Sequence, residues 1–351
     1  MPARVVDWGL FGLLGAALLT GLGTLLVGRP EGRWLFILHS GLGIAILPFL
    51  FWKLRRVFPR LMRPSRWDGA VAFSLMTTFL VAFTVGTGLV WALWLEPAGW
   101  PSGMNLHAYF ALALAAVFWV HVLTRAKPLR VQDLRGRRWV LRALGAGLLA
   151  GLSWEAQEGI SRWLNLPGSR RRFTGSREAG RFTGNAFPVT NWMLDRPAPL
   201  PLEQWKLHVH GAVRRPMTLS YAQIRELPQE ETIAVLDCTG GWYTEQRWRG
   251  IRVGWLLDQA GVRPEARFVR FLSVTGYRWS LPLEEARRAL LATHVGDEPL
   301  IHEHGAPMRL VAPGRRGFQW VKWVVEVEVL SAPDPGQWIA IFLSGLRSGS
   351  S

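Results

Sequence analysis

Three histidines lie inside long apolar stretches of the sequence, where an ionisable side chain is costly and therefore a candidate for function. His107 and His121 are 14 residues apart, so on a helix they point within about 40° of each other, about 21 Å apart along the axis. His39 lies five residues into an earlier stretch, and His107 three residues into its own. If both stretches enter a membrane from the same side, these two imidazoles lie at nearly equal depth. Such a pair can supply both axial ligands of one b-type haem.

His121 has no obvious partner, because the first apolar stretch opens with Val6-Asp7-Trp8 and contains no histidine. We therefore predict one haem, and expect His121 either to border a quinone pocket or to ligate a second haem. A membrane histidine can also simply hydrogen-bond a neighbouring helix. The matched depths of His39 and His107 favour haem for that pair.

A further candidate is Cys238, the one cysteine in 351 residues. A single cysteine excludes disulfides within the chain and cysteine-rich zinc or iron–sulfur sites. Cys238 follows a strand-like run and precedes Gly240 and Gly241. A thiolate at such a strand end can be presented to a metal or a substrate, whereas a lone cysteine elsewhere is usually buried and inert. No nearby His/Asp arrangement supports a cysteine hydrolase, which favours metal ligation.

The elements that carry the histidines are expected to be membrane-spanning helices. Each of four stretches is long enough to cross about 30 Å of hydrocarbon. They are Trp8–Val27, Trp34–Trp52, the range 70–95 and Met104–Thr124. The loop 53–66 holds six Lys/Arg and the loop 125–142 holds seven, against two in 28–33 and none in 96–103. The positive-inside rule therefore predicts a cytoplasmic N-terminus.

A fifth apolar run, 144–154, is short and glycine-rich, and we expect it to anchor the chain and send everything after it outside. Its flank, Arg137-Arg138-Trp139-Val140-Leu141-Arg142, resembles a twin-arginine export signal, here internal. An ordinary basic stop-transfer flank is the alternative. Both interpretations predict a multi-pass protein of a bacterial-type cytoplasmic membrane with its second half outside.

The first half of the chain resembles the four-helix cytochrome b subunits of formate dehydrogenases and hydrogenases, on the spacing of His39, His107 and His121. The resemblance implies an outer haem between the second and fourth spans. It also implies an inner haem between the first and fourth spans, for which this sequence lacks one ligand.

After a linker rich in Arg, Gly and Ser, the pattern changes to short β-rich runs with intervening helices, which predicts a mixed α+β domain. We expect a cytochrome b-like domain over 1–127, a basic loop with the fifth span and linker over 128–183, and the α+β domain over 184–351.

This second half resembles the sulfite oxidase family of molybdenum-cofactor enzymes from Gly184 to Leu330. The resemblance rests on Cys238-Thr239-Gly240-Gly241, the run Glu303–Pro313, and Val321-Lys322-Trp323. It implies that Cys238 binds molybdenum and that Tyr277 is the active-site tyrosine. It implies contacts to the pterin or its phosphate from Asn185, Phe187, Ser273, His304, Arg309, Gly317, Phe318 and Lys322.

Two departures from that family are visible. Sulfite oxidases follow their cysteine closely with substrate-binding arginines, whereas here the first arginine is Arg247, with Arg249 and Arg278 as further candidates. Only 21 residues follow Leu330, so the family's immunoglobulin-like dimerisation domain is not expected. The apolar run 338–346 can pack on the domain or rest against the outer membrane surface, and we expect contact with the membrane half.

Taken together, the sequence predicts an outer molybdopterin enzyme that exchanges an oxygen atom with a small substrate. Its electrons are expected to pass through haem b to or from quinone or another carrier in the lipid bilayer. The alternatives are a periplasmic methionine-sulfoxide or other S- or N-oxide reductase fed by quinol, and a non-catalytic haem-bearing anchor. The net charge of +16 is not attributed to nucleic-acid binding, because the basic loops flank apolar spans.

Overall fold

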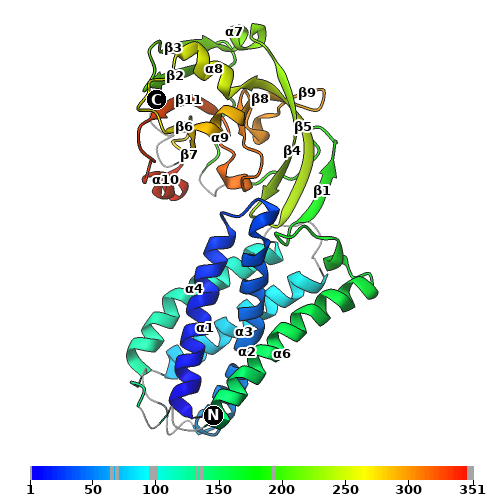
Figure 1. Ribbon diagram of the computed structural model, residues 1–351, viewed down its shortest axis with the longest axis vertical. Coiled ribbons are helices and arrows are strands. Elements are labelled where there is room, and N and C mark those ends of the chain that lie inside the picture. The colour runs from blue at the N-terminus through cyan, green and yellow to red at the C-terminus, as the bar shows by residue number, and fades with distance from the viewer. Residues whose placement is uncertain are drawn as a thin grey trace. The chain divides into compact units, whose positions relative to one another are not determined.

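A computed structural model describes residues 2–63, 67, 71–94, 102–125, 127–130, 133, 137–191 and 195–345. The chain divides into two compact units, Met1–Arg177 and Glu178–Ser351. The first is helical and the second is built on two sheets (Figure 1).

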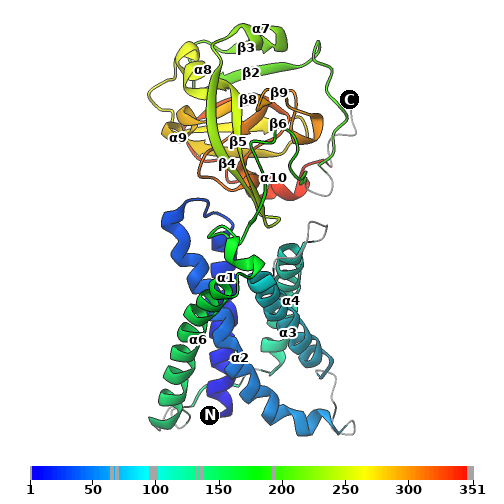
Figure 2. The same cartoon turned by 90° about the vertical axis from the view of Figure 1, so that its right-hand side faces the viewer.

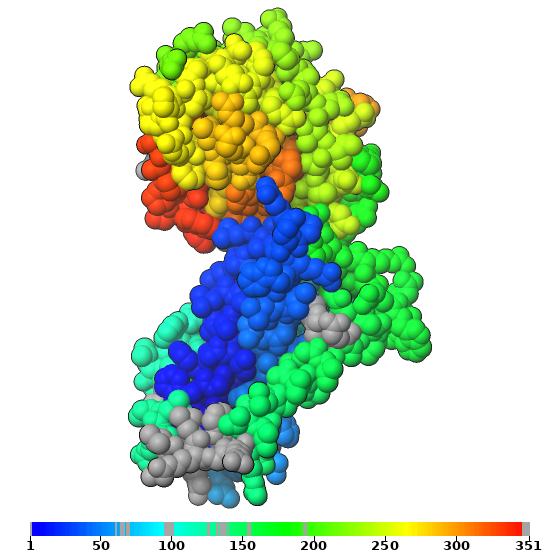
Figure 3. All heavy atoms as spheres, in the orientation of Figure 1, coloured from blue at the N-terminus to red at the C-terminus, as the bar shows by residue number. Residues whose placement is uncertain are grey.

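The helical unit pairs its helices in sequence order: α1 with α2, and α3 with α4 (Figure 2). One face of the unit shows α1 and α2 in blue side by side, with α6 in green along α2 (Figure 3). The helices and 3-10 turns are α1 (Ala3–Thr24), η1 (Pro30–Gly32), α2 (Arg33–Leu61), α3 (Val71–Trp94), α4 (Gly103–Arg125), α6 (Arg137–Trp163) and η3 (Pro167–Arg170).

Each of the four expected spans coincides with one of the helices α1–α4. Among the described residues, these four helices are long and apolar enough to cross a membrane, because each presents about 20 apolar residues. The fifth expected span lies within α6, which is a helix but is not one of those four. The length and composition of these helices suggest a membrane-associated protein, while its insertion, its orientation and the anchoring role of α6 stay predictions.

The second unit contains a six-stranded and a five-stranded sheet. The first has the order β1-β5-β8-β10, with β4 paired to β5 and β9 to β8, and the second has the order β3-β2-β11-β6-β7. The strands are β1 (Arg177–Arg181), β2 (Lys206–Gly211), β3 (Met217–Ser220), β4 (Glu230–Cys238), β5 (Trp242–Arg252), β6 (Phe268–Ser273), β7 (Arg278–Pro282), β8 (Leu290–Val295), β9 (Glu298–Pro299), β10 (Arg309–Val311) and β11 (Val324–Leu330). The helices and 3-10 turns are α7 (Tyr221–Glu226), α8 (Val253–Ala260), α9 (Leu283–Arg288), η4 (His302–His304), η5 (Gly317–Gln319) and α10 (Gln337–Leu343).

Local sequence explains several of these boundaries. Helix α7 begins at a capping box in which Ser220 and Gln223 each accept a hydrogen bond from the other's backbone amide, which satisfies two otherwise unpaired donors. Helix α8 ends at Gly261, whose φ of 67° suits a left-handed cap. Strand β6 alternates buried and half-buried residues, so one of its faces packs into the core.

The apolar C-terminal run forms α10, which packs on β7 of its own unit. Gln337 accepts hydrogen bonds from the backbone and hydroxyl of Ser280, and Trp338 stacks edge-on with Trp279 at 5.0 Å. The helix still exposes Ile339 and Phe342. Packing on the domain is confirmed, while contact with a membrane stays a prediction.

Candidate functional site

Cys238 ends β4 and stands opposite Trp242, the first residue of β5. The three residues between them form a turn in which the Gly241 amide donates to the Cys238 carbonyl at 3.2 Å. Gly241 has a φ of 88°, a conformation that three-residue hairpins require and that glycine adopts without strain. The glycine pair noted in the sequence therefore fixes the position of the thiol.

The environment of the Cys238 thiol has opposing effects on its pKa. Cys238 is 7% exposed, and this burial raises the pKa of the thiol. The amide of Gly240, 3.3 Å from Sγ, and the hydroxyl of Thr190 both favour the thiolate. A bound cation would complete this stabilisation, because thiolates are the form that ligates metals.

Arg316 lies directly beside Cys238, although the sequence analysis did not identify it. Its Nη1 is 2.8 Å from Oδ1 of Asp237, and its Nη2 donates to the Cys238 carbonyl at 3.3 Å. The next residue, Gly317, passes so close that a Cβ there would lie 3.1 Å from Cys238 Cα. A buried acid one residue before the cysteine was the available signal, because a buried carboxylate needs a partner.

Arg309 is a buried cation that has no acidic partner among the residues that the structure describes. It is 1% exposed, and its Nη1 donates to the His304 carbonyl at 2.9 Å. The guanidinium stands 5.2 Å and 5.8 Å from the ring centroids of Trp248 and Trp320, and its Nε has no hydrogen-bond partner. Burial lowers the pKa of Arg309 to about 9.

Lys322 is a second cation at this site, and its side chain is half-buried. Its Nζ donates to three neutral oxygens: the carbonyls of Thr190 and Glu303 at 3.2 Å and 2.6 Å, and Oδ1 of Asn191 at 2.5 Å. Burial, with a contribution from Arg309, lowers the pKa of Lys322 to about 7. Within the described residues, no carboxylate forms an ion pair with Lys322 or Arg309.

His304, Phe187 and Asn185 come together beside these cations. The His304 ring stacks on Phe187 with centroids 3.7 Å apart. Its Nε2 lies 3.0 Å from the Asn185 carbonyl, and burial lowers the pKa of His304 to about 4, so the ring is neutral at pH 7. The Asn185 side chain binds Glu298, and also the backbone at Pro299 and Ile301, so Asn185 joins its segment to β9.

Tyr277 donates its hydroxyl proton to the Phe318 carbonyl at 2.5 Å. Burial, reinforced by the charge of Asp195, raises the pKa of Tyr277. Asp195 itself accepts a hydrogen bond from Thr275, and burial raises its pKa. Ser273 is 3.0 Å from Thr275 through their hydroxyls, so it supports the Tyr277 turn.

Comparison with known proteins identifies this unit. Residues 195–338 match the family model described as the oxidoreductase molybdopterin binding domain. The chain is also 31% identical over 170 residues to the uncharacterized oxidoreductase YuiH of Bacillus subtilis, covering 46% of this chain and 86% of that protein. The chain belongs to the oxidoreductase molybdopterin-binding domain family. It is a molybdopterin-dependent oxidoreductase of the sulfite oxidase family.

The chain matches a smaller share of two further relatives of this molybdopterin oxidoreductase than it does of YuiH. The chain is 31% identical over 175 residues to the protein-methionine-sulfoxide reductase catalytic subunit MsrP of Gluconobacter oxydans, which covers 44% of this chain and 54% of MsrP. It is 30% identical over 189 residues to mitochondrial sulfite oxidase of Rattus norvegicus, which covers 45% of this chain and 33% of that enzyme. The chain thus spans about half of MsrP and a third of sulfite oxidase. The predicted resemblance of the second half is confirmed, whereas that of the helical half stays a prediction.

The residues of this molybdopterin unit fit an anionic cofactor. Charges removed from water are normally paired. In the described part of the unit, however, buried Arg309 and half-buried Lys322 contact only neutral oxygens and aromatic rings. The negative charge of a Cys238 thiolate raises the pKa of both cations, so all three groups belong to one electrostatic cluster. A phosphate-bearing pterin would supply the anion that the described part of the cluster lacks.

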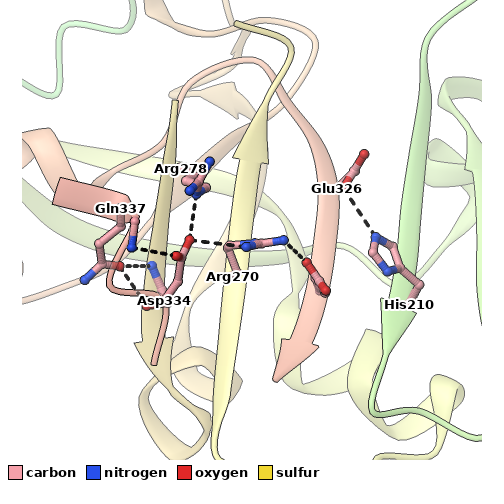
Figure 4. Close-up of polar contacts among 9 residues, drawn as sticks. His210, Arg270, Arg278, Glu326, Asp334 and Gln337 are labelled. Atoms are coloured by element: carbon pink, nitrogen blue, oxygen red, sulfur yellow. Dashed lines mark hydrogen bonds and ion pairs between the residues drawn. The ribbon is translucent and has the colours of Figure 1, made fainter. Parts of the chain in front are cut away.

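The structure does not bring Arg247 into the cluster. Because side chains alternate along β5, Arg247 lies on the face opposite to that of Trp242 and pairs with Asp297 at 3.3 Å. Arg278 is likewise engaged elsewhere, since its Nε is 2.6 Å from Oδ2 of Asp334 (Figure 4). The arginine beside the cysteine is instead Arg316, contributed by a distant loop.

In the helical unit, the His39 and His107 rings face each other with centroids 5.9 Å apart. A metal–nitrogen bond of about 2 Å, with the ring centre about 1 Å beyond, puts two imidazoles on one iron about 6 Å apart. Each Nδ1 lies near a backbone carbonyl, that of Ala17 at 3.0 Å and that of Thr84 at 2.8 Å. Such contacts commonly orient metal-binding imidazoles and leave Nε2 for the metal. The pair therefore fits a bis-imidazole haem.

His121 lies in the same unit and lines a cavity of about 590 Å³ bordered by α1–α4. Its Nδ1 is 3.4 Å from the Ser74 hydroxyl. The walls are largely apolar, including Leu14, Val81 and Phe118, which is typical of small-molecule pockets.

Proposed function

We propose that this chain is a membrane-bound molybdenum enzyme that reduces a small S-oxide outside the membrane with electrons supplied by quinol through one haem b. The observation that carries the proposal is the occurrence, on one polypeptide, of a molybdopterin unit and a pair of facing imidazoles at haem-ligand spacing. A two-electron site and a one-electron carrier on one chain are suited to coupling oxygen-atom transfer to a quinone pool.

In the molybdopterin unit, Cys238 would hold molybdenum through its thiolate. Arg309 and Lys322 would neutralise the pterin phosphate with charge-assisted hydrogen bonds. Neutral His304 donates from Nε2 to the Asn185 carbonyl, so its Nδ1 would accept a hydrogen bond from the pterin. The bound molybdenum supplies two-electron oxygen-atom transfer. Tyr277 keeps its hydroxyl proton because its pKa is raised, and it would donate that proton to the oxygen of the substrate after the hydroxyl turns away from the Phe318 carbonyl.

The charges near Cys238 favour an uncharged substrate. Among the described residues, Arg316 is the arginine that contacts the cysteine backbone, and Asp237 offsets its charge at 2.8 Å. Arg247 and Arg278 are paired with acids away from the cluster. A sulfite dianion would need uncompensated cations, whereas a sulfoxide needs only a donor such as Tyr277. The similarity to the MsrP protein-methionine-sulfoxide reductase of Gluconobacter oxydans agrees with this preference.

Sulfite-like oxidation is the second candidate. Arg316 is the observation that favours it, because a rearranged Asp237–Arg316 pair would present one cation beside molybdenum. The similarity to rat sulfite oxidase supports the same chemistry.

Haem redox state discriminates the two directions in the purified, cofactor-loaded protein. We expect methionine sulfoxide to reoxidise haem that quinol has reduced, as followed by the α-band in the visible spectrum. Reduction of ferric haem by sulfite would instead favour oxidation. Molybdenum and haem contents must be measured first. A protein with haem and no molybdenum would be a non-catalytic anchor, and a protein without haem would contradict the proposal.

A further inference from the structure

The helical unit contains a repeat that the family comparisons do not report. Thr20-Gly21-Leu22 in α1 recurs 67 residues later as Thr87-Gly88-Leu89 in α3, and His39 in α2 recurs 68 residues later as His107 in α4. The helix pairs α1–α2 and α3–α4 are therefore two copies of one hairpin, both running in the same direction. Parallel repeats of this kind are a known way of building membrane proteins.

The contacts around the two histidines repeat with the sequence. His39 Nδ1 lies 3.0 Å from the Ala17 carbonyl, and His107 Nδ1 lies 2.8 Å from that of Thr84, the residue 67 positions later. In each copy the glycine packs against the ring: a Cβ on Gly21 or Gly88 would lie 3.0 Å from Cε1 of its histidine. We name this set the histidine tier.

The same offsets lead to a second set of contacts, which we name the lysine tier: Asp7, Lys53, Ser74 and His121. His121 corresponds to Lys53, and Ser74 to Asp7. In one copy His121 Nδ1 is 3.4 Å from Ser74 Oγ, and in the other Lys53 Nζ is 2.6 Å from Asp7 Oδ1. The positions are equivalent, but only one copy carries an imidazole.

We infer that the lysine tier is equivalent in position to a second haem site. In it, Lys53 stands where the second axial histidine would be, and Asp7 stands where the residue that hydrogen-bonds that histidine would be. The cavity at this level would therefore bind a quinone head group instead of a haem. All four residues line the cavity of about 590 Å³, within the range of ligand pockets. Lys53 and Asp7 form a half-buried ion pair at the wall of this cavity, and Arg56 also binds Asp7 at 2.7 Å.

The cavity has the polarity that a quinone requires. Apolar side chains from four helices accept a hydrophobic ring and tail, while His121, Ser74 and Lys53 offer hydrogen bonds to ring oxygens. This inference rests on the proposed function, in which quinol gives up two electrons and two protons. Quinol plus sulfoxide then yields quinone, sulfide and water, with electrons and protons balanced.

The inference can be tested by introducing the missing histidine and its hydrogen-bonding serine into the first hairpin. The double variant Asp7→Ser with Lys53→His copies Ser74 and His121 into the first hairpin. We expect haem per chain in a pyridine haemochrome assay to rise from one to two, and quinol-driven haem reduction to be lost because haem fills the cavity. The matched control is Arg55→His, which adds a histidine at the same level of α2 on an exposed position and should leave one haem.

The outcomes separate the inference from the proposed function. A double variant that keeps the spectrum of one haem and gains none overturns the inference, as does an unaltered protein with two haems. An unaltered protein without haem overturns the proposed function itself.

A second measurement does not depend on the double variant folding. In Ser74→Ala and His121→Ala, loss of a buried hydrogen bond should raise the KM for decylubiquinol about tenfold, with haem content still one per chain. Loss of haem in His121→Ala, or an unchanged KM in both variants, would contradict the assignment.

Discussion

In the helical unit, the half-buried imidazoles of His39 and His107 each lie near a carbonyl of the preceding helix. In the molybdopterin unit, the cations Arg309 and Lys322 contact only neutral oxygens and aromatic rings among the residues that the structure describes. The first cluster is electrically neutral and complete except at Nε2. The second carries charge that its described surroundings do not neutralise. The difference indicates what each cluster binds: a metal porphyrin needs neutral nitrogen donors, and a pterin phosphate needs cations.

The largest effect is expected from the imidazole pair. Replacing His39 or His107 by Ala removes an axial ligand, so the haem α-band should be lost while molybdenum content is unchanged. His210→Ala is a suitable control, because His210 lies in β2 and binds Glu326 (Figure 4). A normal haem spectrum in both variants would show that His39 and His107 are not the haem ligands.

The converse change is Cys238→Ser, which removes the thiolate that is proposed to bind molybdenum. Sulfoxide turnover should fall by about a thousandfold or more, as for loss of a reacting group, while the haem spectrum stays intact. Metal analysis and turnover on the same sample provide the measurement. Full activity in Cys238→Ser would refute the role of the thiol.

The Lys322→Met substitution is expected to raise the stability of the cofactor-free protein and to weaken cofactor binding. Without cofactor, the variant should be more stable than the unaltered protein, because a buried uncompensated charge is removed. Cofactor retention should fall about tenfold or more, because a charge-assisted contact to phosphate is lost. Arg247→Gln, on the exposed face of β5, should change neither quantity. Chemical denaturation with and without cofactor measures both effects, and a destabilised cofactor-free variant would contradict the assignment.

The pH dependence of the cofactor-free protein follows from the same residue. Lys322 has a pKa of about 7 in the folded state against its ordinary 10.5, so the unfolded chain binds more protons between these values. The free energy of unfolding should therefore decrease as pH falls from about 10.5 to about 7. The decrease should be smaller in Lys322→Met and in the cofactor-loaded protein. An equal pH dependence in all three samples would show that Lys322 is not the source.

The smallest effect is expected from the glycines behind the imidazoles. Gly21→Ala or Gly88→Ala places a Cβ 3.0 Å from Cε1 of the ring, so the imidazole must shift slightly. We expect a shifted haem midpoint potential with haem content largely retained, because ligand orientation tunes the metal. Gly15→Ala adds the same methyl group where nothing lies within 4 Å, and it should leave the potential unchanged.

Much of the fold followed from local patterns. The four apolar stretches predicted α1–α4. The longest strand, β5, is difficult to recognise in the sequence because its outward positions carry charged residues such as Glu245 and Arg247. Its pairing on both sides, with β4 and β8, stabilises it in spite of that composition.

The candidate site was predicted unevenly for a similar reason. Residues inside recognisable motifs, such as Cys238, His304 and Lys322, are brought together by the structure. Arg247 was chosen because it follows the cysteine in sequence, but alternation along β5 turns it to the other face. Arg316, which does contact the cysteine, is 78 residues away in sequence, and no local pattern connects the two.

The sequence alone determined which side chains can do chemistry: histidines in apolar helices at matched depths, and one cysteine before a glycine turn. These are consequences of helical period and residue type, which are local. Only the tertiary structure decided that Arg316 and not Arg247 stands beside the thiol. It also decided that no acidic residue in the described part of the chain pairs with Lys322 or Arg309. Both depend on which segments pack together, and charge compensation is a property of neighbours in space rather than in sequence.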